Sequence, residues 1–319
     1  MDKKTADHAI KVGNGLVAAA LKSRAKALKK RAASLQGKAK KKPQPMKFVA
    51  GVQPKIGFMG LLGGAMENNG VLVAEGDSWF DYPLNDVLSC LEDEHGYDVE
   101  SVAHKGDSVE NMAYAEGQLI DLSRRIEKLI RQGVIPKAIL LSGGGNDIAG
   151  DEFGMLLDHK LSMTSGLNDK IVEGVMERIS HAYTTIIWSV MQLCKESLGK
   201  EIPILVHGYD YPIPDGRGFM GGWGPLPGPW LEPGFREKGF ENMKERIEIM
   251  VSLIDKFNET IKGVASLTKF AGNVVYVDLR GTLKNGTSYE NDWANELHPT
   301  GSGFSMVTNK FATVLSKFP

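Results

Sequence analysis

The stretch Val71-Leu-Val-Ala-Glu-Gly-Asp-Ser-Trp-Phe80 decides the fold. Residues 71–74 are apolar and bounded by turn residues, which predicts a short, fully buried β-strand. The strand runs into Gly76-Asp77-Ser78, and a helical pattern follows from Leu84. A serine on such a turn lies at the carboxyl end of the sheet, where open α/β sheets place their sites. The free N–H groups and positive end of a following helix can stabilise an oxyanion there.

Downstream, strand and helix patterns alternate. We expect strands at 71–74, 99–103, 138–141, 202–206 and 274–277, and helices at about 84–95, 108–132, 171–198, 238–266 and 301–317. Residues 149–170 should be irregular or hold a short helix. Buried strands with intervening helices favour a three-layer α/β/α sandwich around a five-stranded parallel sheet.

One connection between a strand and the next helix is longer than is usual in such an alternating pattern. Residues 209–235 contain six prolines and seven glycines, together with Trp223 and Trp230. Loops of this length are usually functional or disordered. This segment follows the fourth strand at the carboxyl end of the sheet, where Ser78 is also expected, which suggests a lid or substrate-binding loop. The alternative is a structural cap that covers apolar surface.

Four polar blocks follow the expected strands in a fixed order. Ser78 lies in Gly-Asp-Ser, Gly106 in Ala103-His-Lys-Gly-Asp-Ser108, Asn146 in Ser142-Gly-Gly-Gly-Asn-Asp147, and His298 in Asn295-Glu-Leu-His-Pro299. These blocks resemble those of the SGNH hydrolase (GDSL esterase/lipase) superfamily, and the resemblance covers roughly residues 71–319. It implies the flavodoxin-like strand order 2-1-3-4-5.

The resemblance also implies roles for these residues. Ser78 would be the nucleophile and His298 its base, since a serine hydroxyl needs an adjacent base at neutral pH. The backbone N–H groups of Ser78 and Gly106 and the side-chain amide of Asn146 would form the oxyanion hole. No metal or organic cofactor is implied. Asp77 and Asp147 are expected to hydrogen-bond loop backbone rather than to bind a metal.

Three tryptophans are candidate substrate-binding residues. Trp79 stands where the family often has a small aliphatic residue after its serine. It should pack behind the nucleophile or line the pocket. Trp223 and Trp230 belong to the long loop.

The sequence departs from the family in the residue that would orient the histidine. The usual pattern is Asp-x-x-His, and here Asn295 stands in the aspartate's place. A neutral amide oxygen can accept the imidazole N–H and fix its tautomer, but it cannot stabilise the imidazolium with a full charge. Three alternatives stay open: Asn295 orients His298, Asp292 does so, or a backbone carbonyl serves and the site is a dyad.

Charge is unevenly spread along the 319 residues. Residues 1–47 hold 14 Lys/Arg and 2 Asp/Glu, whereas the remainder holds 24 Lys/Arg and 37 Asp/Glu. This pattern indicates a basic arm (1–47) ahead of the hydrolase-like domain (48–319), with Pro43 and Pro45 marking a linker. Leucines at 21, 28 and 35 predict a helix over about 15–35. The arm is interpreted as a solvated, partly disordered tail, or as a contact for an acidic protein, nucleic acid or an anionic membrane.

The remaining composition is that of a globular protein. The two cysteines, Cys90 and Cys194, are expected to be buried thiols, and no secretory signal pattern is present, so we expect a cytoplasmic protein. The sequence thus predicts a serine esterase or lipase acting on a lipid ester, a thioester or an acetylated carbohydrate. The alternative is a slow or inactive scaffold of the same fold, tethered by its basic arm.

Overall fold

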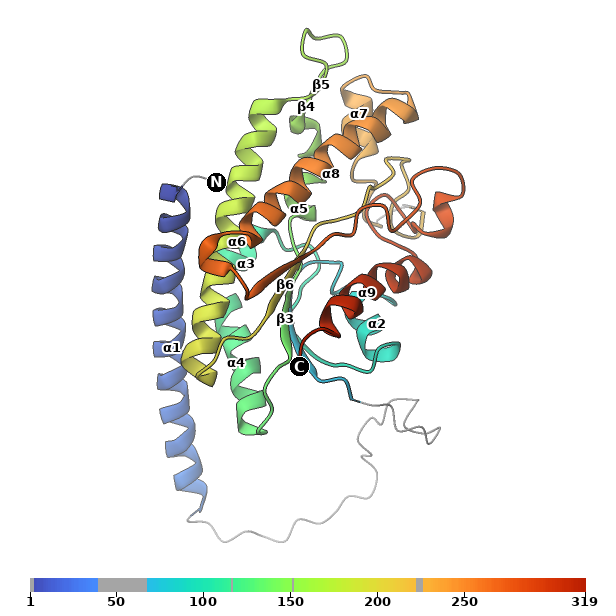
Figure 1. Ribbon diagram of the computed structural model, residues 1–319. Coiled ribbons are helices and arrows are strands. Elements are labelled where there is room, and N and C mark those ends of the chain that lie inside the picture. The colour runs from blue at the N-terminus through green and yellow to red at the C-terminus, as the bar shows by residue number, and fades with distance from the viewer. Residues whose placement is uncertain (1–2, 40–67, 116, 151, 222–225) are drawn as a thin grey trace.

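The computed structural model describes residues 3–39, 68–115, 117–150, 152–221 and 226–319. Its centre is a five-stranded parallel sheet of order β2-β1-β3-β6-β7 (Figure 1). The strands are β1 (Val71–Glu75), β2 (Asp98–Ser101), β3 (Ala138–Leu141), β6 (Ile204–His207) and β7 (Val274–Val277). The predicted fold class and strand order are confirmed. Pro43, Pro45 and Trp223 lie outside the described residues.

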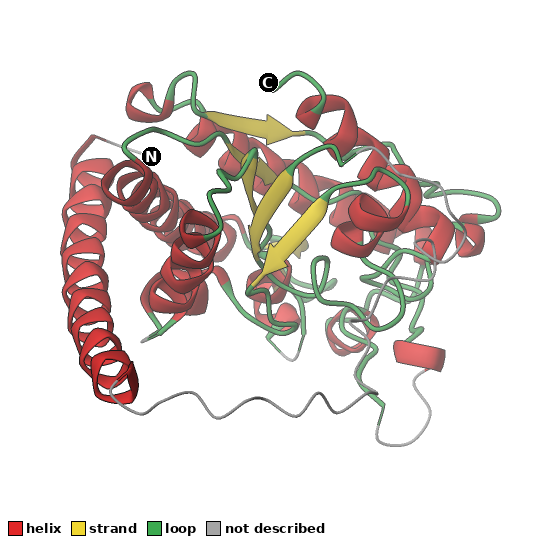
Figure 2. Ribbon diagram, turned by 90° about the horizontal axis from the view of Figure 1, so that it is seen from below, coloured by secondary structure: helices red, strands yellow, loops and turns green. Residues whose placement is uncertain are grey.

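Helices cover both faces of the sheet (Figure 2). The helices α4 (Gln118–Arg131), α6 (Asp169–Leu198) and α8 (Met243–Ala265) pack together on one face. On the other face α2 (Val87–Asp93) packs against α9 (Gly301–Leu315). Among the described residues, no helix is both long enough and apolar enough to cross a membrane.

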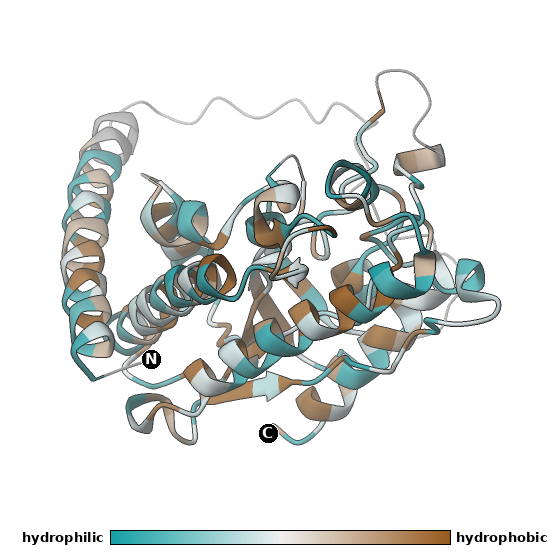
Figure 3. Cartoon of the chain, turned by 90° about the horizontal axis from the view of Figure 1, so that it is seen from above, coloured by the Kyte–Doolittle hydropathy of each residue, from teal (hydrophilic) through white to brown (hydrophobic). Residues whose placement is uncertain are grey.

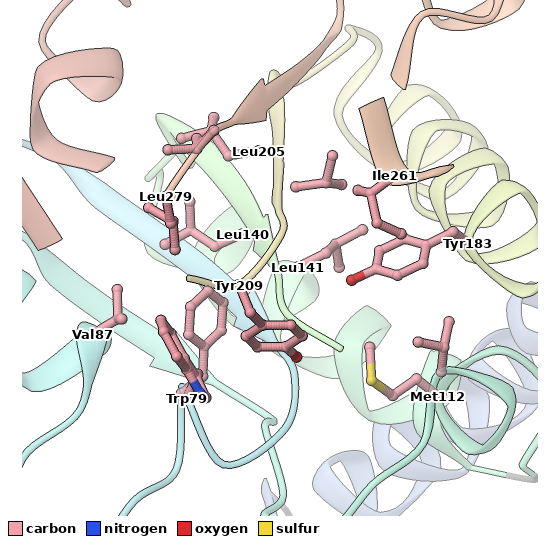
Figure 4. Close-up of a cluster of buried hydrophobic side chains, with 14 of the residues drawn as sticks. Trp79, Val87, Met112, Leu140, Leu141, Tyr183, Leu205, Tyr209, Ile261 and Leu279 are labelled. Carbon is pink, nitrogen blue, oxygen red and sulfur yellow. The ribbon is translucent and has the colours of Figure 1, made fainter. Parts of the chain in front are cut away.

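The central strands are largely apolar because both faces of the sheet are covered, and their polar residues, Glu75 and His207, come last in β1 and β6. Every residue of β3 and β6 is buried. Figure 4 shows Leu140, Leu141 and Leu205 in this core, with Trp79 and Tyr209 nearby. Figure 3 shows the same distribution, with brown strands in the middle and teal segments on the outer helices. Burying each such side chain stabilises the fold by about 1.5–3 kcal/mol.

One sequence expectation is wrong and a second is incomplete. The single helix expected over 108–132 is two, α3 (Val109–Tyr114) and α4, because Ala115 is extended and Gly117 has a φ of +111°. Residues 149–170 also contain a small antiparallel pair, β4 (Leu157–Asp158) and β5 (Gly166–Leu167). The remaining short elements are α5 (Gly145–Ile148), η2 (Phe153–Leu156), η3 (Phe219–Gly221), α7 (Glu232–Glu237), η4 (Thr268–Phe270) and η5 (Tyr289–Asn291).

The basic arm forms α1 (Lys3–Ala39), which lies along α6 as an additional outer layer (Figure 1). Its buried face is made of small and medium apolar residues at helical spacing: Ala9, Ile10, Gly13, Val17 and Ala20. A Cβ on Gly13 would lie 3.0 Å from both Ser189 Oγ and Trp188 Cδ1, so the two helices approach closely there.

Polar contacts complete this interface. Trp188 Nε1 donates to Asn14 Oδ1 at 2.8 Å, and the Arg24 guanidinium makes two hydrogen bonds to the Glu127 carboxylate. The interpretation of the arm as a solvated tail is therefore wrong for its first half. Residues 25–33, in contrast, are all exposed.

The close approach at Gly13 predicts a stability difference between two glycine substitutions on one helix. Gly13→Leu should lower the free energy of unfolding by about 1–3 kcal/mol, because the side chain overpacks the α1–α6 interface. Gly15→Leu is the matched control, since a Cβ there meets nothing within 4 Å and both variants gain the same helix propensity, up to about 1 kcal/mol. Denaturant titration checks the pair, and equal stabilities would contradict the packing.

Candidate active site

The structure brings Ser78 and His298 into contact across 220 positions of sequence. Ser78 Oγ lies 2.7 Å from His298 Nε2. Ser78 occupies the turn after β1, and His298 lies in the loop before α9. That loop is folded back on itself, because Ala294 N donates to His298 O at 2.9 Å and Thr300 N donates to Asp292 O at 2.8 Å.

The surroundings of Asn295 define the protonation of the imidazole. Asn295 Oδ1 accepts the backbone N–H groups of Leu297 and His298 at 3.0 and 2.9 Å, so this atom is the oxygen. The same oxygen lies 3.1 Å from His298 Nδ1, which must therefore carry the proton. Nε2 is then unprotonated and accepts the Ser78 hydroxyl. The Asn295 amide nitrogen donates to the hydroxyl of Tyr82 at 2.9 Å.

Asp292, the second candidate for orienting the histidine, is engaged elsewhere. Its Oδ2 accepts the backbone N–H of Lys284 at 2.9 Å. Of the three alternatives that the sequence leaves open, the geometry matches Asn295.

His298 is buried between aromatic rings. Tyr82 stacks on the imidazole with centroids 4.2 Å apart, and Trp230 approaches edge-on at 5.6 Å. Burial lowers the pKa of His298 to about 3, since the charged form loses hydration and Asn295 supplies no compensating charge. The imidazole is thus neutral, as a base must be, throughout the physiological range.

The three predicted oxyanion donors come from the ends of three neighbouring strands. Among the described residues, the backbone N–H groups of Ser78 and Gly106 have no hydrogen-bond acceptor. Gly106 has a φ of +90°, and a Cβ there would meet nothing within 4 Å, so its backbone is open to an approaching group. Asn146 Nδ2 donates one hydrogen to Asp107 O at 2.9 Å, which leaves the second one available.

Two carboxylates, buried Asp77 and half-buried Asp147, hold these loops together. Asp77 accepts the Ser142 hydroxyl at 2.8 Å, the Trp79 backbone N–H at 3.1 Å and the hydroxyl of Tyr209. Asp147 accepts the Val109 N–H at 2.9 Å, which joins the Asn146 loop to the start of α3. As expected, both carboxylates hydrogen-bond the loops.

A small cavity of about 40 Å³ adjoins the serine and the histidine. Ser78, Asn146 and His298 line it, and the rest of its wall is largely apolar, with Ile148, Leu231, Met250, Ile254 and Trp293 among the lining residues. Trp79 combines both expected positions, since it packs in the core and lines this cavity. Its indole N–H donates to Leu297 O at 3.1 Å, so it also supports the histidine loop.

Sequence reasoning missed Glu296, which anchors the 209–235 loop. This side chain is fully buried and accepts four backbone N–H groups. The donors are Trp230 at 2.6 Å, Leu231 at 2.8 Å, Glu232 at 2.9 Å and Gly216 at 3.0 Å. One carboxylate thus ties both ends of the loop to the residue two positions before His298. No sequence signal near Glu296 indicates this role, because its four donors lie far from it along the chain.

The anchoring of the loop predicts a large cost for a nearly isosteric change. Glu296→Gln leaves backbone donors facing an amide NH₂ group, and we expect the free energy of unfolding to fall by about 2–4 kcal/mol. Trp230 should also shift away from His298, because it loses its anchor. Glu290→Gln, at an exposed position, is the control. Equal stability of the two variants would refute the anchoring role.

Comparisons with known proteins find solved structures that are only distantly similar to this chain. No protein-family model and no curated protein matches the chain. A lipase from a goat rumen metagenome shares 13% identity over 76% of this chain and 96% of that chain, with a TM-score of 0.46. An aryl esterase of M. smegmatis shares 12% identity over 78% and 100% of the two chains (TM-score 0.44).

A catalytic mutant of an acetylxylan esterase from Geobacillus stearothermophilus shares 16% identity over 78% and 95% of the two chains, with a TM-score of 0.39. Because these identities and TM-scores are low, the function is inferred from the geometry of the site. In its strand order, and in the order of Ser78, Gly106, Asn146 and His298 along the chain, the protein resembles the SGNH hydrolases.

Proposed function

We propose that the protein is a serine hydrolase that cleaves a carboxylic ester through an acyl-enzyme on Ser78. The observation that supports this most directly is the 2.7 Å hydrogen bond from Ser78 Oγ to an imidazole nitrogen that must be unprotonated. A hydroxyl paired with an oriented base is the arrangement by which serine becomes nucleophilic at neutral pH.

Acylation follows from this geometry. His298 Nε2 takes the Ser78 proton as Oγ bonds to the ester carbonyl carbon. The carbonyl oxygen, now negatively charged, is received by the N–H groups of Ser78 and Gly106 and the free amide hydrogen of Asn146. Collapse of the tetrahedral intermediate breaks the C–O bond, and His298 returns its proton to the departing alkoxide.

Deacylation repeats the steps with water as the nucleophile. His298 takes a proton from water, the hydroxide attacks the acyl carbon, and Ser78 leaves with the proton that His298 carries. In both halves the imidazolium is transient and faces the neutral Asn295 oxygen. A carboxylate there would stabilise that cation more, so we expect slow turnover.

The size of the cavity supports a small acyl group. About 40 Å³ accommodates roughly three water-sized spheres, close to the heavy atoms of an acetyl group. Acetyl esters are therefore the first substrates to test, ahead of long-chain lipids. A scaffold without activity is the alternative, and it rests on the absence of a charge beside His298.

Labelling with a fluorophosphonate probe tests the nucleophile directly. Wild type should be labelled, whereas Ser78→Ala and His298→Ala should lose labelling, because the first removes the hydroxyl and the second its base. Ser165→Ala and His159→Ala, at exposed positions, are the matched controls and should be labelled normally. Failure to label the folded wild type would favour the inactive scaffold.

The pH profile tests the role of Asn295. Since the pKa of His298 is lowered to about 3, kcat/KM for p-nitrophenyl acetate should stay level from pH 8 down to about pH 5, past the ordinary histidine pKa of about 6.5. Asn295→Asp places a carboxylate beside Nδ1, raises that pKa and moves the acid limb to higher pH.

Asp292→Asn is the control for this experiment and should leave the acid limb in place. A fall in the kcat/KM of the wild type near pH 6.5 would contradict the conclusion that burial lowers the pKa of His298. The same depressed pKa makes the fold less stable as pH falls from about 6.5 towards 3, because only the unfolded chain gains the proton in that range.

A further inference from the structure

A second hollow lies away from the serine, between α1 and α4. Its volume is about 710 Å³, within the range of roughly 300–1,000 Å³ that is typical of small-molecule sites. Residues 101–104, at the carboxyl end of the edge strand β2, form part of its wall. In Figure 1, α1 runs alongside the body past α4, and the two helices are in contact.

The helices present basic faces to this hollow. On α4 the basic residues are Arg124, Arg125, Lys128 and Arg131, and on α1 they are Arg24 and Arg31. Within each helix their spacing places them on one side, since residues three, four and seven apart share a face. The basic face of α1 therefore lies opposite a basic face of α4, although residues 48–319 as a whole are acidic.

The carboxylates nearby neutralise only half of this charge. Glu127 pairs with Arg24 and Arg131, Glu100 pairs with Arg125 and Lys128, and Asp121 pairs with Arg124. Against these three carboxylates stand six cations lining the hollow. Among the described residues Arg31 has no carboxylate partner. The hollow thus keeps an excess of positive charge.

The cations remain reachable from solvent. The side chains of Arg124, Arg125, Lys128 and Arg131 are 43–62% exposed, so their guanidinium and ammonium groups can exchange carboxylates for another anion. Arginine matches phosphate oxygens with two parallel N–H donors, which makes arginine-rich sites selective for phosphate groups.

We propose that this cleft binds a compact polyanion that carries two or more phosphate groups. The recessed shape suits a small molecule bridging the two helices rather than a flat surface. Among the described residues that line the cleft there is no Phe, Tyr or Trp, so recognition depends on the phosphates rather than on stacking against a large aromatic ring. Phosphates between α1 and α4 would also fasten the exposed second half of α1 to the body.

The wall of the cleft is connected to the hydrolytic site. Val102 N donates to Ala74 O, and His104 N donates to Gly76 O, both at 2.9 Å. Gly106 follows two residues after His104. The wall of the cleft is therefore continuous with the loop that carries a proposed oxyanion donor, although binding itself does not require the site to be active.

Titration calorimetry of the full chain with inorganic tripolyphosphate tests the proposal. We expect saturable 1:1 binding that weakens as salt is added. Arg31→Glu combined with Arg124→Glu should weaken it by at least about tenfold, since each charge-assisted hydrogen bond lost is worth roughly that factor. Arg31→Ala with Arg124→Ala should weaken binding in the same direction and avoids new repulsion with Asp121.

Lys310→Glu combined with Lys317→Glu is the matched control, because it makes the same change in net charge at exposed positions of the chain's C-terminal end. Equal weakening in that control would mean that only net charge matters and would overturn the site. So would an absence of tripolyphosphate binding by the folded wild type.

Parallel titrations identify the source of the phosphate. Vesicles of phosphatidylcholine with phosphatidic acid, and a single-stranded DNA oligonucleotide, are added to the same proteins. If either of these binds and tripolyphosphate does not, the basic surface is an interface for a macromolecule and the small-polyanion proposal is wrong. Orthophosphate at matched ionic strength should bind more weakly than tripolyphosphate, because its single phosphate group cannot contact the basic residues of both α1 and α4.

Discussion

The oxygen of the Asn295 side chain is the point on which the site depends. It receives two backbone N–H groups of its own turn and faces the Nδ1 atom of His298. The first two contacts shape the turn, and the third fixes the tautomer that leaves Nε2 free for Ser78. A single neutral acceptor therefore sets both the position and the protonation of the proposed base. It does so without the charge that a carboxylate would bring, in a site where burial already disfavours the imidazolium.

Much of this arrangement could be predicted from the sequence, because the relevant patterns are local. The buried runs at 71–74, 138–141 and 274–277 identified strands within one residue of their observed ends. In a parallel sheet the carboxyl ends of strands meet at one edge, so the polar residues after them had to gather. That logic brought together Ser78 and Asn146, whereas His298, well after the last strand, was included through the family resemblance. The catalytic roles assigned to them remain predictions.

The features that escaped prediction depend on contacts between distant segments. Nothing local marks Glu296 as the acceptor for four N–H groups, because its donors lie 64–80 positions earlier. The break between α3 and α4 arises from the positive φ of Gly117, which a pattern of apolar residues does not report. The sequence of the arm indicated a solvated tail because alanine and glycine contribute little to a pattern of hydrophobic residues. Their value lies in allowing a close approach to α6, which only the partner surface reveals.

The position of α1 ahead of α6 along the chain has a consequence during synthesis. Its partner α6 ends at Leu198, so the docking surface is completed only after about 160 further residues have been added to the end of α1. At roughly 5–20 residues per second this interval is on the order of ten seconds. A helix with large apolar side chains would be an aggregation hazard throughout that wait. A face made mainly of alanine, glycine and valine, with Ile10 as its one larger side chain, gives a nascent chain little apolar surface for association before α6 has been made.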